Sequence, residues 1–184
     1  MADGWQPDKR WADRFEPAIR LILAQYLIRP ATRVEDTEQG TDLCFVIAGG
    51  TIGCRVRDAD KYLARYPYDW TLRRTRPSGI KSELTKIIDL GKPDWYVYAL
   101  GHGDSGELAR WILVDMQAFR AQWMRHGVRG FGVADSDDPD AIKGTVKPNR
   151  DGSSDFVAVN VRSLAPQCFV AVSPGFWKTP AKAA

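Results

Sequence analysis

The chain has 184 residues, of which 44% are hydrophobic and 27% charged, and its formal net charge is +3. This length favours one domain over two, and the mild basic excess permits nucleic-acid binding without requiring it. The apolar run Leu21–Ala24, like every other apolar run of the chain, is far too short to span a membrane, and Met1–Trp5 lacks the pattern of a signal peptide. Cys44, Cys54 and Cys168 form no C-x-x-C pair, so we expect reduced thiols in a cytoplasmic protein.

A helix and a β-hairpin are predicted in the first third of the chain. Trp11–Ile28 carries apolar residues at helical spacing, and Arg29–Pro30 ends that helix. Thr41–Ala48 and Thr51–Arg57 are rich in aliphatic and β-branched residues, which is typical of strands. Gly49–Gly50 between them is a tight-turn signal, so the two strands are expected to pair as a hairpin.

The middle of the chain is predicted to alternate strands and helices. Gly91 follows the helix expected at Lys81–Leu90 and is a typical C-terminal stop. A glycine-rich segment that begins at Gly101 separates two apolar strands and is expected to be a hairpin loop. In chain order we expect a strand at Trp70–Arg74, a helix at Lys81–Leu90, strands at Trp95–Leu100 and Ala109–Asp115, and a helix at Met116–Arg125.

The last third of the chain differs in composition. Gly127–Gly152 is rich in Gly, Asp, Pro and Lys and is predicted to be irregular. Phe156–Val161 alternates apolar and polar residues and is expected to be a strand, as is Cys168–Val172. The order of all these elements indicates an α/β fold with a mixed central β-sheet flanked by helices.

Charged residues on the predicted hairpin are the first candidates for a functional site. Asp42 lies near the start of one strand, and Arg55 and Arg57 share one face of the other. Such a set can anchor a metal, bind phosphate, or form an ion-pair ladder on a solvated face. Glu16 on the upstream helix and Glu83 on the downstream helix are further acids that are able to converge on the same edge of the sheet.

This arrangement resembles the core of the PD-(D/E)xK nuclease superfamily. The resemblance covers residues 11 to 115 by element order, and it implies a restriction-endonuclease-like core at residues 11–125 of a single domain, with residues 126–184 as a C-terminal extension. In that superfamily, acids of the first helix and of both motif strands hold a divalent metal, usually magnesium. The resemblance places Glu16 and Asp42 among these ligands and puts Arg57 where the superfamily has its lysine.

Arg55 occupies the position at which the superfamily has its second metal-binding acid. An arginine cannot ligate a cation, because it is always charged and offers no lone pair. One alternative is that an acid from a neighbouring element replaces it, which gives a Mg²⁺ site of Glu16, Asp42 and Glu83. The other is that the fold is retained and catalysis is lost, which leaves a DNA-binding relative. The stretch from residue 40 to residue 90 also resembles small proteins carried by phages and mobile elements.

The resemblance implies metal-assisted hydrolysis of DNA if catalysis is retained. A magnesium ion held by Asp42 and a second acid would polarise the phosphate and lower the pKa of a bound water. Arg57 or Lys81 would stabilise the developing negative charge, which makes Asp42, Arg57, Glu83 and Lys81 the expected catalytic set. Arg55, Arg57, Arg73 and Arg76 are the expected contacts to nucleic-acid phosphates. A protein-interaction module, such as an inhibitor or adaptor with a protein partner, is the alternative function.

Other chemical signals in the sequence are weaker. His102 and His126 are the only histidines, and His102, which has no nearby cysteine or second histidine, is interpreted as a loop residue, so we expect no zinc site. Asp135–Asp140 lacks the glycine and the terminal glutamate of an EF-hand loop. We therefore expect a solvated acidic loop at these residues and no calcium site.

Overall fold

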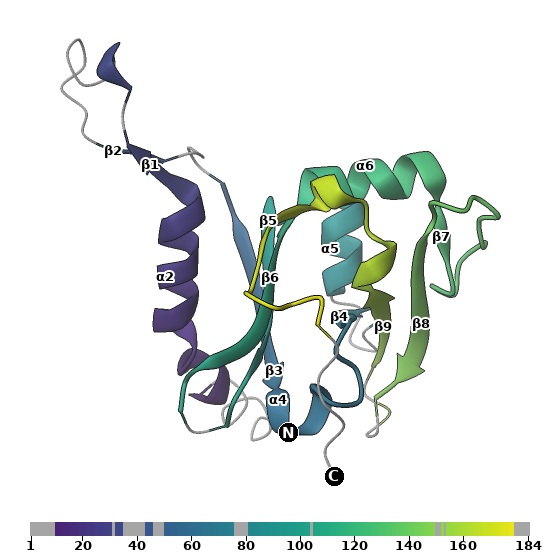
Figure 1. Cartoon of the computed structure of the whole chain (residues 1–184). Helices are drawn as coiled ribbons and strands as arrows, with labels where there is room; N and C mark the ends of the chain where they lie inside the picture. Colours follow the sequence, from purple (N-terminus) through teal and green to yellow (C-terminus); the bar gives the residue numbers. More distant parts are fainter. Residues whose placement is uncertain are drawn as a thin grey trace.

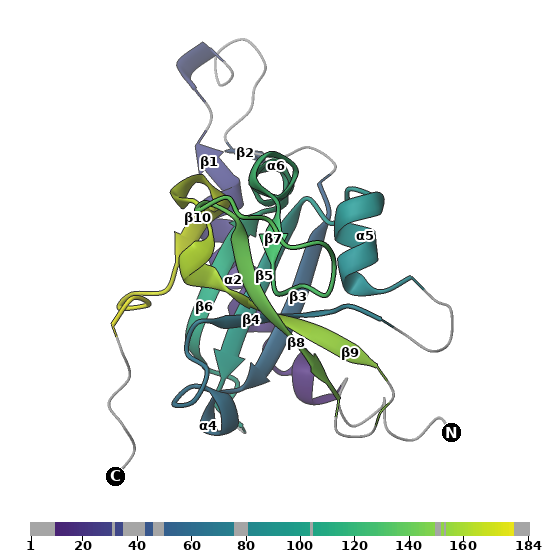
Figure 2. The ribbon, with the colours of Figure 1, turned by 90° about the vertical axis from the view of Figure 1, so that its right-hand side faces the viewer.

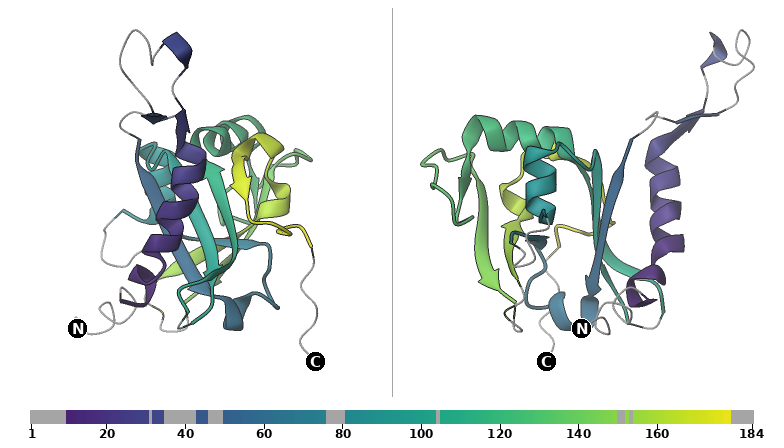
Figure 3. Two further views of the ribbon diagram at one scale, coloured as in Figure 1. Left: turned by 60° about the vertical axis from the view of Figure 1, so that its left-hand side comes forward. Right: turned by 180° about the vertical axis from the view of Figure 1, so that it is seen from behind.

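The fold has three layers, a helix and two mixed four-stranded sheets (Figure 1). A computed structural model describes residues 10–30, 32–34, 43–45, 50–75, 81–103, 105–149, 152 and 154–178. Helix α2 (Glu16–Leu27) covers the outer face of the first sheet, as both views of Figure 3 show. The expected α/β class and the mixed sheet flanked by a helix are confirmed, although there are two such sheets.

The first sheet has the strand order β10-β6-β5-β3 and contains one parallel pair. Strands β3 and β5 run parallel, with Ile52 opposite Trp95 and Asp58 opposite Gly101. The other neighbouring strands in this sheet are antiparallel. The strands are β3 (Ile52–Asp58), β5 (Trp95–Gly101), β6 (Leu108–Asp115) and β10 (Phe169–Val172).

The second sheet has the order β4-β9-β8-β7, and α5 (Glu83–Asp89) and α6 (Met116–His126) lie over one end of the two sheets (Figures 1 and 2). Its strands are β4 (Asp69–Arg73), β7 (Val128–Arg129), β8 (Ile142–Pro148) and β9 (Asp155–Asn160). The short elements are β1 (Ile28–Pro30), β2 (Leu43–Phe45), α4 (Ala59–Tyr62), and the 3₁₀ turns η1 (Val161–Ser163) and η2 (Pro166–Cys168).

Hydrophobic cores form on both faces of the first sheet, because alternate residues of its strands point to opposite sides. Tyr96 of β5 packs with Trp70 and Phe119 in the core beneath the second sheet, α5 and α6. The next residue, Val97, packs in a separate core against Phe15 at the start of α2. The first sheet is therefore buried on both faces, as a sheet between two layers must be.

Side chains that cap the helices determine where α5 and α6 begin. Ser82 Oγ accepts the backbone N–H of Thr85 at 3.1 Å, which starts α5 and makes Glu83 its first residue. Asp115 caps α6 in the same way. Gly127 follows α6 with a φ of 74°, a conformation that glycine adopts without strain.

The predicted hairpin is wrong. Strand β3 pairs in parallel with β5, and residues 43–45 of β2 pair with residues 28–30 of β1. The predicted irregular region is also wrong, because it contains the seven-residue strand β8. Strands after residue 126 complete both sheets, since β10 pairs with β6 and β9 pairs with β4. Among the described residues, no helix is both long and apolar enough to cross a membrane.

The parallel pair β3–β5 is fastened at its start by Asp94. Its Oδ2 accepts the backbone N–H and the hydroxyl of Thr51, both at 2.8 Å, and Lys92 Nζ lies 2.9 Å away. The hydrogen bond from the Thr51 backbone, then those from Lys92 and from the Thr51 hydroxyl, lower the pKa of Asp94 below its ordinary value of 3.8. The ionised carboxylate therefore stabilises the folded chain above that ordinary value, and its contribution falls as the pH drops below it.

We expect Asp94→Asn to remove this acid-dependent part of the stability. The variant should be less stable than the wild type at neutral pH, and the difference should shrink as the pH is lowered below about 4. Urea denaturation followed by circular dichroism at a series of pH values measures it. Asp137→Asn is the control, because the Asp137 side chain is fully exposed and its ion pair with Arg129 is long, at 3.9 Å. Equal pH profiles for Asp94→Asn and the wild type would contradict the assignment.

Candidate functional site

Glu83 joins four elements of the fold through its carboxylate. Its Oε2 accepts the backbone N–H of Arg73 on β4 at 2.9 Å and lies 2.9 Å from Arg55 Nη2 on β3. Its Oε1 accepts a hydrogen bond from the hydroxyl of Tyr96 on β5. Arg55 in turn donates to the carbonyl of Thr71 on β4 at 3.3 Å. The side chains of Arg55 and Glu83 are only 27% and 20% exposed, so the pair lies largely out of solvent.

Glu83 raises the pKa values of both Arg55 and Tyr96, and we call these three residues the anchor. Burial acts to lower the pKa of Arg55, but the carboxylate of Glu83, together with Tyr96 and Tyr98, more than offsets it, and the net shift is upward. Burial and then the neighbouring Glu83 charge raise the pKa of Tyr96 well above its ordinary value. The two carboxylate oxygens of Glu83 are thus already in contact with an arginine, a tyrosine hydroxyl and a backbone amide.

A cleft of about 970 Å³ lies beside this anchor. It is bounded by the ends of β3 and α4 on one side and by β4, β9 and β8 on the other, towards the lower end of the molecule in Figure 1. Alternation along β4 turns Asp69, Thr71 and Arg73 into the cleft while Trp70 and Leu72 enter the core. Its lining has five cationic residues and two acids: Arg57, Lys61, Arg65, Arg73 and Lys147, with Asp60 and Asp69.

Arg57 is held in the cleft by an aromatic ring and a hydroxyl. The carbon of its guanidinium lies 3.8 Å from the centre of the Tyr62 ring and 5.9 Å from that of Phe156. Its Nη1 donates to the Thr71 hydroxyl at 3.3 Å. Among the described residues no carboxylate forms an ion pair with it. A guanidinium positioned in this way keeps further N–H donors for an anion.

The two acids of the cleft, Asp69 and Asp60, have different surroundings. Burial raises the pKa of Asp69, while the charges of Lys147 and Arg57 act to lower it. Asp60 lies at the rim, where its Oδ1 is 2.9 Å from Nδ1 of His102 and both side chains are about half exposed or more. Lys61 is paired at 2.8 Å with Asp58, the residue that caps α4. Arg65, like Lys61, is exposed, whereas the other three cations of the lining, Arg57, Arg73 and Lys147, are partly buried.

The predicted nucleic-acid residues divide between the anchor and the cleft. Arg57 and Arg73 line the cleft, whereas Arg55 is bound to Glu83 beside it. Lys81 is exposed one residue before the cap of α5 and does not line the cleft. Arg76 and Asp42 lie outside the described residues.

The structure does not bring the predicted metal ligands Glu16 and Glu83 together. Glu16 lies on α2, where it pairs with Arg20 at 2.6 Å. Burial and then the Glu16 charge raise the pKa of Cys54 to about 11, and Cys54 lies on the α2 side of β3, opposite Val97. Glu83 contacts Arg55, which points from the other face of the same strand. Two carboxylates on opposite faces of a sheet cannot share one cation.

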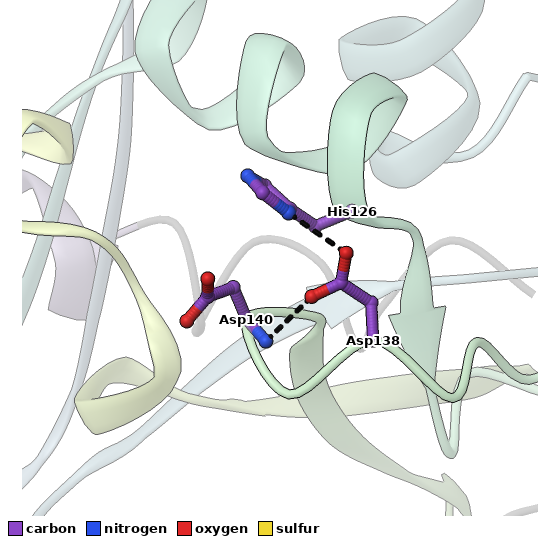
Figure 4. Close-up of side chains that lie close together, drawn as sticks. All are labelled: His126, Asp138 and Asp140. Atoms are coloured by element: carbon purple, nitrogen blue, oxygen red, sulfur yellow. Dashed lines mark hydrogen bonds and ion pairs between the residues drawn. The ribbon is translucent and has the colours of Figure 1, made fainter.

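Another group of the described residues lies close enough to share a cation. Ligand atoms of His126, Asp138 and Asp140 lie within 4.8 Å of one another. Figure 4 shows these three side chains. His126 Nδ1 is 3.0 Å from Asp138 Oδ2, and Asp138 Oδ1 accepts the backbone N–H of Asp140 at 2.8 Å. These contacts also account for the group without a metal, because they tie the loop before β8 to the end of α6. The acidic loop is thus more ordered than its composition indicates.

Sequence reasoning missed several residues of the cleft. Tyr62 comes from a short turn, and Lys147 comes from β8, which was expected to be irregular. Phe156 begins one expected strand and Asp69 lies just before another, and their role depends on which strands pair. Thr71 and Arg73 at alternate positions were the one available signal for this face.

No family model, curated protein or solved structure matches this chain. The function is therefore argued from the geometry of the cleft.

Proposed function

We propose that the chain binds nucleic acid, with backbone phosphates held by Arg57, Arg73 and Lys147 in the cleft and with no hydrolysis there. The observation that carries this proposal is the state of Arg57, which is oriented by Tyr62 and Thr71 and has no described carboxylate as an ion-pair partner. A planar guanidinium with free donors suits phosphate oxygens. The excess of cationic over acidic side chains in the lining supports a polyanion as ligand.

Metal-dependent hydrolysis stays a prediction from the family resemblance. Glu83 would have to give up Arg55 and Tyr96 before it bound Mg²⁺, which leaves Arg55 without its counter-ion and the Tyr96 hydroxyl without its acceptor. The same contacts favour the alternative in which the fold is retained and the second acid is lost. Incubating DNA with the protein and Mg²⁺ or Mn²⁺ tests hydrolysis directly.

We also propose that the fold is a diverged restriction-endonuclease-like core. Two features support this. Strand β3 is followed along the chain by α4, β4 and α5 and then by its parallel neighbour β5, and α2 covers the opposite face of that sheet (Figure 3). These features retain the helix, charged strand and later helix of the resemblance, but not the hairpin that it also includes.

Replacing Arg57 with alanine should weaken nucleic-acid binding about tenfold and reduce the salt dependence of the affinity by about one phosphate contact. Fluorescence anisotropy of a labelled oligonucleotide, titrated at several salt concentrations, measures both quantities. Asp69→Asn should shift the affinity the other way, because it removes a negative charge from the same cleft. Arg57→Lys should give an intermediate affinity, since it keeps the charge but loses the planar stack on Tyr62.

Arg20→Ala is the matched control, because it removes the same charge from the exposed surface of α2 on the opposite side of the first sheet. An equal loss of affinity in Arg20→Ala and Arg57→Ala would mean that net charge alone drives binding, and the cleft would then not be the site. A stable complex with a protein partner that Arg57→Ala leaves unchanged would favour the adaptor function instead.

A further inference from the structure

We infer that the cleft takes an unpaired nucleotide, so that the chain prefers single-stranded to duplex nucleic acid. This inference rests on the proposed function and names the form of nucleic acid that the same site accepts. It depends on three properties of the cleft: its concave shape, its aromatic lining and its mixture of hydrogen-bonding groups.

The shape of the cleft suits a small inserted group. A volume of about 970 Å³ is at the upper end of the range for pockets that enclose small molecules. A duplex presents its phosphates on a convex surface and keeps its bases stacked inside. Only a base that has left the stack can enter a pocket of this kind, and in duplexes that costs unpairing energy.

The lining combines rings with cations in the way that single-strand binding requires. Four aromatic residues face the cleft: Tyr62, Tyr66, Tyr98 and Phe156. The guanidinium of Arg57 lies over the Tyr62 ring, and Lys147 Nζ lies 4.6 Å from the centre of the Tyr66 ring. Bases stack on aromatic rings and on guanidinium planes, while neighbouring cations hold the phosphates. A purely electrostatic surface for duplex DNA has no need of rings at these positions.

Polar groups on β4 and β5 are placed to bond the edge of an inserted base. Thr71 is 3% exposed, and its hydroxyl oxygen accepts a hydrogen bond from Arg57. Tyr98 is 7% exposed; burial raises the pKa of its hydroxyl, which shares a hydrogen bond with the Thr71 side chain. Asp69 adds a carboxylate acceptor in the same lining. Donors and acceptors at the closed end of a pocket recognise base edges, which paired strands keep occupied.

The test compares a short labelled single strand with its blunt duplex at one fixed salt concentration, by fluorescence anisotropy. The single strand should bind at least about tenfold more tightly, because stacking adds to the phosphate contacts. Phe156→Leu should weaken single-strand binding about fivefold and leave duplex binding unchanged. Tyr26→Leu removes a ring from α2, on the opposite side of the first sheet, and should change neither affinity.

The outcomes separate the inference from the proposed function. Equal affinities for both forms, both weakened by Arg57→Ala, would overturn the inference and leave phosphate binding in place. Equal losses for both forms in Phe156→Leu would overturn it too, since the ring would then support the fold alone; thermal melts of the variant report that effect. Absence of binding to either form would overturn the proposed function itself. Competition by a free nucleoside monophosphate against the single strand, abolished in Arg57→Ala, would support the inference.

Discussion

Replacing Glu83 with alanine should lower the free energy of unfolding by about 3 kcal/mol, which corresponds to a fall of roughly 6–12 °C in melting temperature for a chain of this size. The loss has a specific origin. Arg55 would keep its charge in a site where its side chain is only 27% exposed, and the Tyr96 hydroxyl would lose its acceptor. Urea denaturation followed by circular dichroism measures the difference.

Two further variants separate the ion pair from the packing around it. Glu16→Ala should change the free energy of unfolding by about 0.5 kcal/mol or less, because both side chains of its ion pair with Arg20 are exposed. The double variant Arg55→Met, Glu83→Leu should recover the part of the loss that comes from the unpaired charge, since two apolar side chains leave no buried charge, whereas the Tyr96 hydroxyl still lacks its acceptor. A Glu83→Ala protein as stable as the wild type would show that Arg55 finds another partner.

The same variant separates the structural role of Glu83 from the metal role that the sequence predicted. A structural anchor loses stability in Glu83→Ala whether or not Mg²⁺ is present. A metal ligand would instead lose stabilisation that depends on the concentration of the ion. The wild type should therefore show the same melting temperature with and without Mg²⁺. A Mg²⁺-dependent increase that Glu83→Ala abolishes would restore the nuclease prediction.

How far the sequence predicts this molecule depends on the range of the contacts involved. The helices at α2, α5 and α6 and the strands β4, β5, β6, β9 and β10 follow from local periodicity and end signals, and all are confirmed. Gly49–Gly50 is an equally clear local signal, yet β3 pairs with β5, whose residues come 43 positions later along the chain. Parallel pairing needs a crossover connection, which no local pattern reveals.

The site shows the same limit. Glu83 and the two arginines of β3 were identified as candidates, but the reason they matter changed. Arg55 and Glu83 neutralise each other, and Arg57, two residues further on the same face, is left facing the cleft. The sequence cannot distinguish these two arginines, because the difference lies in which residues of β4 and α5 stand opposite them. Lys147 was not identified because strand β8 was not predicted. Its glycine and lysines obscure the alternation of Ile142, Gly144 and Val146 on one face.

Gly101 at the end of β5 gives the second large expected effect. It is buried, and a Cβ atom at this position would collide with the ring of Phe15, which is itself completely buried. Its φ is not positive, so the requirement is for space and not for an unusual backbone conformation. Gly101→Ala should therefore cost about 2–3 kcal/mol, because overpacking forces the ring or the strand to move.

The neighbouring Gly103→Ala is the matched control. A Cβ atom there meets only Asp60 Oδ2 at 4.0 Å, and its φ is not positive either, so we expect a change within about 0.5 kcal/mol. Combining Gly101→Ala with Phe15→Leu should cost less than the sum of the two single variants, since the smaller side chain makes room for the methyl group. Additive losses in that double-mutant cycle, measured by urea denaturation, would show that Phe15 is not what excludes a side chain.

Gly101→Ala should also affect the cleft, because Gly101 pairs with Asp58, the residue that caps α4 next to Arg57. A shift of β5 away from Phe15 would displace the end of β3, so Gly101→Ala should weaken nucleic-acid binding while Gly103→Ala leaves it unchanged.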